Sequence, residues 1–496
     1  MSKQIFHSFK SRFRKANTGG EDVATAVAAN QPSPAPQPTE DVIRALTENT
    51  AENSEELAEQ LQILSLTEEE VRENRIRRER LAYQTSVVVK LGSMLMAAGA
   101  GSYRVKASME RLAHAIGIEK LETHASLMEL NTTAFKADTF RTEVVEQRAV
   151  GVNAARIDAL RQFTRSLRPN MLAEDADQAL DAIAAQPHLY SRLQLAVASG
   201  VGCAGFAFLN KGGLIECLAV LVAAFLGQYV RSMMLGKRFN HVATWMVCSA
   251  IATSIYIGTV SMMVSFGFAD NTHQAGAVSA ILFLVPGFPL VTAILDLVRL
   301  DLNAGITRGT YVAILMVAAG VSVWAVTFVT NWSVKPSAPM VIAPLLLLAL
   351  NSLATFIAAT SFGVLFNTPL SIAATAGLVS ALLNPLRILL VSLGYPNQAM
   401  VGLMSMLVGL FAALLSTKVR SSRVTLSVPA VVIMIPGVPF YRAITAVNQG
   451  ETLTAFASIA EVSFVILAIG VGLAISRMLT DPGWTFDSPR KSKIIA

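Results

Sequence analysis

The stretch Val285-Pro286-Gly287-Phe288-Pro289 lies inside an apolar segment long enough to cross a bilayer, and Ile435-Pro436-Gly437-Val438-Pro439 repeats its pattern later in the chain. We call Pro286–Pro289 and Pro436–Pro439 the proline tetrads. Proline removes a backbone donor and clashes with the carbonyl four residues earlier, and glycine adds backbone freedom. Hydrocarbon tolerates a broken helix only where protein or a water-filled cavity satisfies the freed backbone groups. The tetrads therefore predict two broken spans around a binding site.

Composition supports a membrane protein with a polar N-terminal part. Of the 496 residues, 53% are hydrophobic and 15% are charged, whereas soluble proteins have roughly 25% charged residues. The three cysteines lie in apolar runs without CxxC spacing, so no metal or other cofactor is expected. We find no GxSxG, HExxH or P-loop pattern. This excludes a recognisable enzyme or ATP motor and favours transport driven by an ion gradient.

The polar part divides into an arm and a small domain. Residues 1–79 are expected to form a disordered or helical arm with a proline-rich linker, and residues 80–187 a cytoplasmic α+β domain. The segment 83–100 is more typical of a soluble helix than of a span, because it contains Gln84 and Lys90. The remaining elements are predicted as helices at 102–116, 152–167 and 173–185 and strands within 121–135 and 139–148.

Ten apolar spans follow, each near the length needed to cross about 30 Å of hydrocarbon. If the α+β domain is cytoplasmic, the cytoplasmic loops contain eight Lys or Arg residues and the opposite loops two. This asymmetry predicts that both termini are cytoplasmic, with 481–496 as a cytoplasmic tail. The expected spans are 189–209, 214–231, 241–263, 275–298, 309–329, 340–361, 369–393, 398–416, 424–445 and 453–476.

The ten spans divide into two groups of five, 188–330 and 340–480, and an odd repeat forces the second group into the opposite topology. Each tetrad lies at a similar depth in the fourth span of its group. The predicted architecture is thus an α-helical polytopic protein of two inverted five-helix repeats, an arrangement found in many secondary transporters.

The broken spans can supply a carboxylate site. Each half-helix after a break begins with proline in its first turn, so its free N–H groups and positive dipole end face the middle of the membrane. The alternative is that the prolines merely kink two packed spans. The first interpretation assigns substrate binding to the backbone at Pro286, Gly287, Pro289, Pro436, Gly437 and Pro439.

Ionisable residues inside spans supply further candidates, since each costs at least about 2.5 kcal/mol at the bilayer centre. Asp296, two turns after the first tetrad, would meet a substrate ammonium or carry a coupling proton. Arg387 and Arg442 would either hold a substrate carboxylate or neutralise a buried acid. Glu461 and Glu216 are coupling candidates, although Glu216 could equally reach the membrane interface.

Arg299, Asn303 and Arg308 cluster with Asp301 near the cytoplasmic end of the fourth span. They form either a gate or an ordinary charged loop end, and the sequence does not distinguish these two interpretations.

Two groups of motifs carry a family resemblance. The segment 284–290, continuing through Asp296, Asn303, Gly305 and Arg308 and preceded by Asn210-Lys211-Gly212-Gly213, resembles the N-terminal-type module of the bacterial threonine/serine exporter family. The later half resembles the smaller partner module. Its matching residues are Phe366-Asn367-Thr368-Pro369, Arg387, Ser405-Met406-Leu407-Val408-Gly409 and Ile435-Pro436-Gly437-Val438-Pro439.

The resemblance covers residues 80–480 and implies export of threonine and serine driven by the proton gradient, with the two modules fused. Split members, associated with dicarboxylates such as succinate, resemble the chain equally well. Where some relatives have a Gly-His pair, this chain has Asn384-Pro385, which puts any histidine role there in doubt.

We therefore expect an antiporter-type amino-acid exporter in the bacterial inner membrane, with a site between the two tetrads. Its partners would be the small-molecule substrate and membrane lipid but no nucleic acid, and homo-oligomerisation is left open. Dicarboxylate export is the first alternative. A membrane-anchored hydrolase using residues 80–187 is an alternative from another class.

Overall fold

The computed structural model describes residues 54–148, 150–268, 276–332, 342–448 and 450–485. Its contacts divide the chain into two units, 1–76 and 77–496. The first unit is described only over residues 54–76, which belong to helix α4, Ser54–Ala97. Most of the predicted N-terminal arm, and the tail after residue 485, lie outside the described residues.

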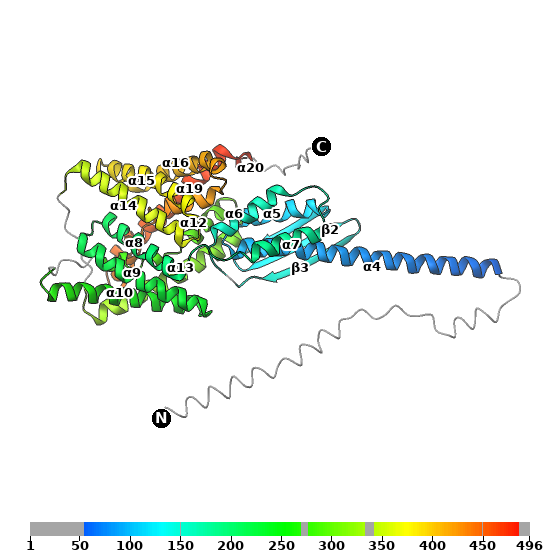
Figure 1. The fold of residues 1–496 in the computed structure, drawn as a ribbon, viewed down its shortest axis with the longest axis horizontal. Coiled ribbons are helices and arrows are strands. Elements are labelled where there is room, and N and C mark those ends of the chain that lie inside the picture. The colour runs from blue at the N-terminus through cyan, green and yellow to red at the C-terminus, as the bar shows by residue number, and fades with distance from the viewer. Residues whose placement is uncertain (1–53, 149, 269–275, 333–341, 449, 486–496) are drawn as a thin grey trace, which may run out of the picture. The chain divides into compact units, whose positions relative to one another are not determined.

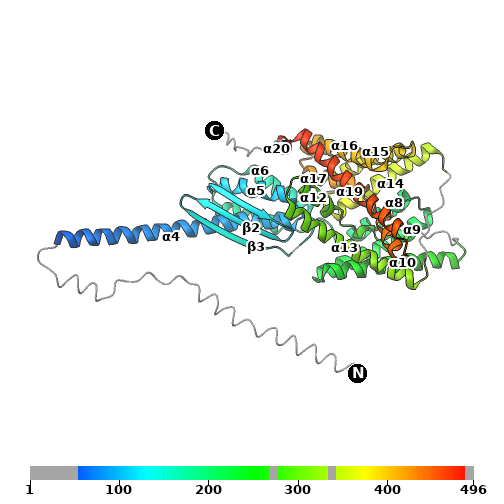
Figure 2. The same cartoon turned by 180° about the vertical axis from the view of Figure 1, so that it is seen from behind.

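The second unit begins with a small α+β region, here residues 77–187, in which helices cover one face of a sheet (Figures 1 and 2). An antiparallel sheet of order β1-β2-β3 pairs Leu130 with both Ala125 and Val145. The buried side chains of β2 alternate with exposed ones, as in a sheet with one covered face. The elements are α5 Ser102–Ala115, β1 Lys120–Ala125, β2 Glu129–Lys136, β3 Thr139–Glu146, α6 Ala154–Ser166 and α7 Ala173–Ala184.

The predicted strand 121–135 is wrong in one respect, because it is two strands. Ser126 turns the chain there: its backbone N–H donates to Glu129 O, and its hydroxyl accepts from the Met128 and Glu129 N–H groups. Such a short side-chain-to-backbone turn interrupts an otherwise continuous β pattern. The boundaries of the three predicted helices agree with those of α5, α6 and α7 to within two residues.

Among the described residues, eight helices are long and apolar enough to cross a membrane, and two bent pairs raise the number to ten. The prediction of a helical membrane protein with about ten spans is confirmed at this level. Helix α4 is not among these candidates, as expected for a soluble helix. The eight are α8 Arg192–Leu209, α9 Leu214–Gly236, α10 His241–Ser265, α13 Leu302–Val329, α14 Pro344–Leu365, α15 Leu370–Ser392, α16 Asn397–Lys418 and α19 Thr452–Thr480.

The two bent pairs contain the proline tetrads. Helix α11, Gly276–Ser279, and the 3-10 turn η1, Leu282–Leu284, lead into α12, Gly287–Val298, with a bend of 66°. Helix α17, Arg423–Val432, leads into α18, Gly437–Asn448, with a bend of 55°. Both predicted breaks are therefore present.

Helix α13 starts seven residues before the predicted span at 309. Leu300 takes a left-handed conformation with φ of 60°, and its neighbour Asp301 donates its N–H to Asp296 O. This tight turn ends α12 and starts α13 at once. The boundary was missed because hydropathy detects the apolar run but not the polar first turn of a helix.

The helices of the two halves pack in corresponding ways. Within the first half α8 packs on α9, α10 on α13, and α12 on α13; within the second α14 packs on α15, α16 on α19, and α18 on α19. Helices α8 and α14 meet through Gly202 and Gly205, where a side chain would strike Ser361 or the Ala354 carbonyl. Small residues allow such close approach in membranes. The inverted repeat itself stays a prediction.

The α+β region contacts one end of the membrane helices, which we call the proximal end, and the opposite end is the distal end. Asn367, after α14, donates its amide to the side chain of Asn153, the N-cap of α6, at 2.8 Å. The N–H of Leu189, just before α8, donates to the same Asn367 at 2.9 Å. Thus α8 begins and α14 ends at the proximal end, and the two helices run in opposite directions.

Candidate functional site

The first break exposes backbone carbonyls that two side chains then bind. Pro286 has φ −78° and ψ 62°, which stops the 3-10 turn before α12 begins. The indole N–H of Trp245 donates to Leu284 O at 2.7 Å, and Arg231 donates to Phe283 O at 3.2 Å. Arg231 also lies over the Trp245 ring, 4.5 Å from its centroid. The freed groups are satisfied by protein, as the hydrocarbon environment requires.

Sequence reasoning missed Arg231 and Trp245. Arg231 was counted only as a loop charge, because a residue at the end of a predicted span gives no sign of reaching back to a break. An arginine followed fourteen residues later by an isolated tryptophan is no recognised motif. Their role depends on α9 and α10 both packing beside η1 and α11.

The second break has its own satisfied carbonyl. The hydroxyl of Ser380, on α15, donates to Ala430 O at 2.9 Å. Gly437 donates its N–H to Ile435 O at 2.9 Å, as Gly287 does to Val285 O at 2.8 Å in the first break. The two tetrads thus share a local backbone arrangement.

The two breaks touch each other. A Cβ on Gly287 would lie 2.9 Å from Val432 Cγ2, and a Cβ on Gly437 would lie 2.5 Å from Leu282 Cδ2. A cavity of about 20 Å³ lies beside them, lined only by apolar residues, glycines and Tyr441. That volume has room for about one water molecule. The half-helix N-termini therefore meet in the middle of the helix bundle, but at a tight apolar contact.

The two half-helices that follow the tetrads point to opposite ends of the bundle. Helix α12 runs to the proximal end, where Arg299 stacks between Tyr103 and Trp484 at 4.2 and 5.1 Å from their centroids. Helix α17 starts at the proximal end, so α18 continues toward the distal end. The tetrads consequently occupy equivalent places in two oppositely directed broken spans.

Asp296 lies at the proximal end of α12 with 2% of its surface exposed. Its Oδ1 accepts from the Ser102 N–H at 3.0 Å, and its Oδ2 lies 3.8 Å from Arg308 Nη2. That Oδ2 accepts no hydrogen bond from the described residues. Gly101 allows this approach, because a Cβ there would be 3.0 Å from Oδ1. Among the described residues, therefore, only Oδ1 of the carboxylate accepts a hydrogen bond.

Arg308 joins the two regions of the second unit. It is 3% exposed and donates to Gly99 O at 3.4 Å, Ala100 O at 3.1 Å and the Thr292 hydroxyl at 2.8 Å. Gly99 has φ of 88°, a conformation that favours glycine. The turn between α4 and α5 is thereby fixed against α12 and α13. Figure 2 shows α12 and α17 next to α5 and α6.

Asp158, on α6, makes the corresponding connection to the second broken span. Its carboxylate accepts from the Ser421 hydroxyl at 2.5 Å, the Ser422 N–H at 2.8 Å and the Thr425 hydroxyl at 3.2 Å. A carboxylate beside the first turn of α17 satisfies free donors and the helix dipole. The α+β region therefore binds the proximal ends of both broken spans. Asp158 was not a sequence candidate, since acidic residues are common on soluble helices.

Of the other predicted residues, only Arg442 is close in sequence to a break, three residues after Pro439. Arg387 donates to Asn384 at 3.0 Å and Asn397 at 2.7 Å in the distal half of α15. Glu216 is buried near the distal start of α9, with its carboxylate beside Gly213. Glu461 is partly buried in the distal third of α19. The side chains of Arg442, on α18, and Asn303, on α13, are exposed. Arg299 and Arg308 both lie at the proximal end, where each contacts the α+β region, and a gating role for them stays a prediction.

A cavity of about 250 Å³ opens at the proximal end, between the α+β region and the membrane helices. We call it the arginine cavity. It is lined by Asp296 and Thr292 of α12 and by residues of α5, α6, α16, α17, α19 and α20, Pro482–Thr485. Its charged lining residues are Arg104, Arg111, Arg161, Arg165, Arg423, Arg477, Asp296 and Asp481. Sequence analysis identified Asp296 alone of these, because the arginines are distributed over four helices.

Comparison with known families covers most of the chain. Residues 86–330 match the family described as "Putative threonine/serine exporter", and residues 351–479 match the family described as "Threonine/Serine exporter, ThrE". The chain belongs to the threonine/serine exporter family. It contains both modules in one chain, which confirms the resemblance found in the motifs.

Individual relatives carry two different names. The "Probable succinate transporter subunit YjjP" of Escherichia coli (strain K12) is 26% identical over 252 residues, covering 51% of this chain and 95% of that protein. The "Probable threonine/serine exporter" of Mycobacterium tuberculosis (strain ATCC 25618 / H37Rv) is 24% identical over 416 residues, covering 80% and 76%. No solved structure matches the chain. Membership in this exporter family makes the chain a multi-pass transporter of the cytoplasmic membrane and not an enzyme.

Proposed function

We propose that this family member is a secondary exporter of threonine and serine, coupled to the proton gradient, with both termini and the α+β region in the cytoplasm. The observation that carries the proposal is the contact between two broken spans, which brings the N-termini of α12 and α18 together inside the helix bundle. Backbone N–H groups and positive dipole ends at such a contact suit a substrate carboxylate.

Transport in this scheme requires the tetrads to separate. The space beside them holds about one water molecule, so an amino acid fits only after α12 moves relative to α17 and α18. The α+β region binds the proximal ends of both broken spans through Arg308 and Asp158. We infer that the opening toward the cytoplasm involves the same contacts, because they connect the two halves at that end.

Asp296 is the stronger candidate for the coupling proton or the substrate ammonium. It is almost fully buried, lines the arginine cavity and leaves Oδ2 without a hydrogen-bond donor among the described residues. Glu461, the other candidate, is only partly buried and has no described polar contact. A buried ionisable group in a transporter is expected to carry function.

The deciding experiment is counterflow with the full chain in proteoliposomes. Vesicles loaded with unlabelled threonine should accumulate labelled threonine, and serine inside should replace threonine. An imposed pH gradient should drive uphill movement. Labelled threonine that fails to exchange, in vesicles where the protein is folded and inserted, contradicts the proposal.

The role of Asp296 is tested by Asp296→Asn. This variant should lose uphill efflux while remaining in the membrane, and Asp138→Asn on the exposed turn between β2 and β3 is the matched control. Normal uphill export by Asp296→Asn removes the assignment. Glu461→Gln in the same assay identifies which of the two acids carries the proton.

Dicarboxylate export is the second candidate. It is favoured by the arginine cavity at the proximal end and by the name of the relative similar to the N-terminal half. Labelled succinate in the same counterflow assay decides between the two, because a zwitterion and a dianion should not exchange equally well through one site.

A further inference from the structure

The residues that line the arginine cavity carry an excess of positive charge. Six arginines and two aspartates line it, a formal excess of four positive charges. They come from the α+β region and from both halves of the membrane region, so the charge is gathered by the tertiary structure.

Several of these guanidinium groups lack an acidic partner. Within the described residues, the guanidinium groups of Arg104, Arg165 and Arg477 form no hydrogen bond or close ion pair, and Asp158 and Asp481 attract Arg104 and Arg477 only at longer range. Arg161 donates only to Ser421 O, and Arg423 donates only to the hydroxyl and carbonyl of Thr480. Structural arginines at domain junctions are ordinarily paired with carboxylates. Here the guanidinium groups remain available to bind another oxyanion.

Partial burial makes this arrangement costly for the protein alone. Desolvation lowers the pKa of Arg104, against the opposing attraction of Asp158. Burial and the neighbouring Arg165 and Arg104 lower the pKa of Arg161 to about 10. Arginine side chains stay protonated at neutral pH in proteins, so the mutual repulsion of these guanidinium groups persists in the fold. An anion between them would relieve it.

We propose that the arginine cavity is a binding site for a compact anion with at least two negative charges, such as a phosphate group, distinct from the carboxylate site proposed at the tetrads. Zwitterionic threonine or serine has no net charge and would leave the excess in place. A dianion can accept paired hydrogen bonds from several guanidinium forks. The cavity, at about 250 Å³, is below the roughly 300 Å³ at which drug-sized ligand pockets begin, so the ligand is small.

Occupancy of this site would act on transport. Its walls include Asp296 on α12, Arg423 on α17 and Arg477 on α19, together with α5 and α6. The cationic residues are on α5, α6, α17 and α19, so a bound dianion would bridge the α+β region and the proximal ends of the second broken span and α19. It favours the arrangement in which these elements are together, because a ligand stabilises the state that it binds.

Binding is tested by thermal unfolding of the purified full chain at constant ionic strength and at about pH 8, where phosphate is chiefly a dianion. Inorganic phosphate should raise the unfolding temperature saturably at millimolar concentrations. Acetate and chloride at the same ionic strength should not. An equal rise with acetate would show general screening and overturn the proposal.

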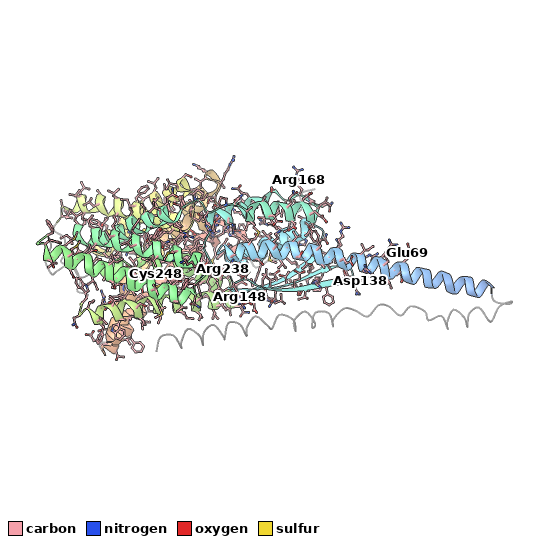
Figure 3. The ribbon with its side chains drawn as sticks, turned by 60° about the horizontal axis from the view of Figure 1, so that its bottom comes forward. Glu69, Asp138, Arg148, Arg168, Arg238 and Cys248 are labelled. Carbon is pink, nitrogen blue, oxygen red and sulfur yellow. The ribbon has the colours of Figure 1, made fainter. Side chains whose placement is uncertain are left out.

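The site is tested by the double variant Arg104→Gln and Arg477→Gln. The phosphate concentration for half-maximal stabilisation should rise by about tenfold or more, since each lost charge-assisted hydrogen bond is worth about tenfold in affinity. The matched control is Arg168→Gln, an exposed arginine of the α+β region outside the cavity (Figure 3). A double variant that keeps the wild-type phosphate response overturns the proposal.

Folding of the double variant is checked in the absence of anion. Removing two repelling charges should leave its unfolding temperature equal to or above that of the wild type. If the variant is instead unstable, the single variant Arg165→Gln, at an exposed cavity position, provides the same titration. A tenfold weaker response in that variant supports the site, and an unchanged response contradicts it.

The phosphate group could come from a free solute or from an anionic lipid headgroup. In the first case, the protein in nanodiscs of zwitterionic lipid should show the full rise in unfolding temperature with phosphate. In the second case, replacing part of the lipid with phosphatidic acid should abolish that response by occupying the site. Because both arms measure binding, they remain valid even if the protein does not exchange threonine.

Discussion

The contact between the proline tetrads and the arginine cavity both bring distant segments together, but with opposite chemistry. The first is tight and largely apolar, with about 20 Å³ of free space, and the polar groups described beside it are backbone groups and the Tyr441 hydroxyl. The second is larger, about 250 Å³, and carries a formal excess of positive charge. A hinge suits the first environment because aliphatic surfaces can separate without leaving charges unpaired. Recognition of an anion suits the second.

The two environments are connected by Asp296 and Arg308. Asp296 is at the end of the half-helix that begins at the first tetrad, and it also lines the cavity. Arg308 fixes the turn of the α+β region against the same helix. The following variants change one environment at a time.

The largest effect is expected from Arg308→Met. It leaves Asp296 without its nearest cation and removes the donors to Gly99 O and Ala100 O. Breaking a buried ion pair by removing one partner costs about 3–5 kcal/mol. The unfolding temperature should fall sharply, while the exposed control Arg168→Met should not change it. Adding Asp296→Asn should restore part of the loss, and no recovery would mean that the two charges do not interact.

A smaller loss is expected from Asp158→Ala. Three donors at the start of α17 lose their carboxylate acceptor, and hydrogen bonds to a charged group contribute about 2–3 kcal/mol. Thermal unfolding measures the loss of stability. The control is Glu129→Ala, a substitution of an exposed residue on β2. Counterflow should also slow, because α17 leads directly into the second tetrad. Unaltered stability would show that the α+β region does not support this helix.

The tight contact is tested by Gly287→Val. The new side chain would meet Val432 and Ile435 at about 3 Å from its Cβ, and overpacking costs about 1–3 kcal/mol. Threonine exchange should fall more than stability does, because the contact must close in every transport cycle. Gly309→Val, where a Cβ meets nothing within 4 Å, should retain exchange. Equal exchange by both variants would argue against movement at the tetrads.

The smallest effect concerns the charge of the cavity at high pH. The pKa of Arg161 is lowered to about 10 by desolvation, Arg165 and Arg104, so its charged form is disfavoured in the fold. That destabilisation is present below about pH 10 and is relieved as the pH rises through this value toward the ordinary arginine pKa. The stability of wild type relative to Arg161→Gln should therefore increase between about pH 9 and pH 11. The difference in stability between wild type and the control variant Arg168→Gln should not change over this pH range.

The sequence was sufficient for the features that depend on local chemistry. Apolar runs of spanning length located the membrane helices, and proline beside glycine located both breaks. The split of the strand at Ser126 and the early start of α13 at Leu302 were missed, since each depends on one tight turn. Arg231 and Trp245 were missed as well, because they act on carbonyls of another helix.

By itself, then, the sequence determined the membrane class, the approximate spans and the positions of the two breaks, because hydropathy and missing backbone donors are properties of the residues themselves. Only the tertiary structure decided that the breaks touch, that Asp158 and Arg308 bind their proximal ends, and that six arginines surround one cavity. Those arginines come from four helices, two in the α+β region and two in the membrane region more than two hundred residues later. Charge accumulates there through packing, which no single stretch of the chain can indicate.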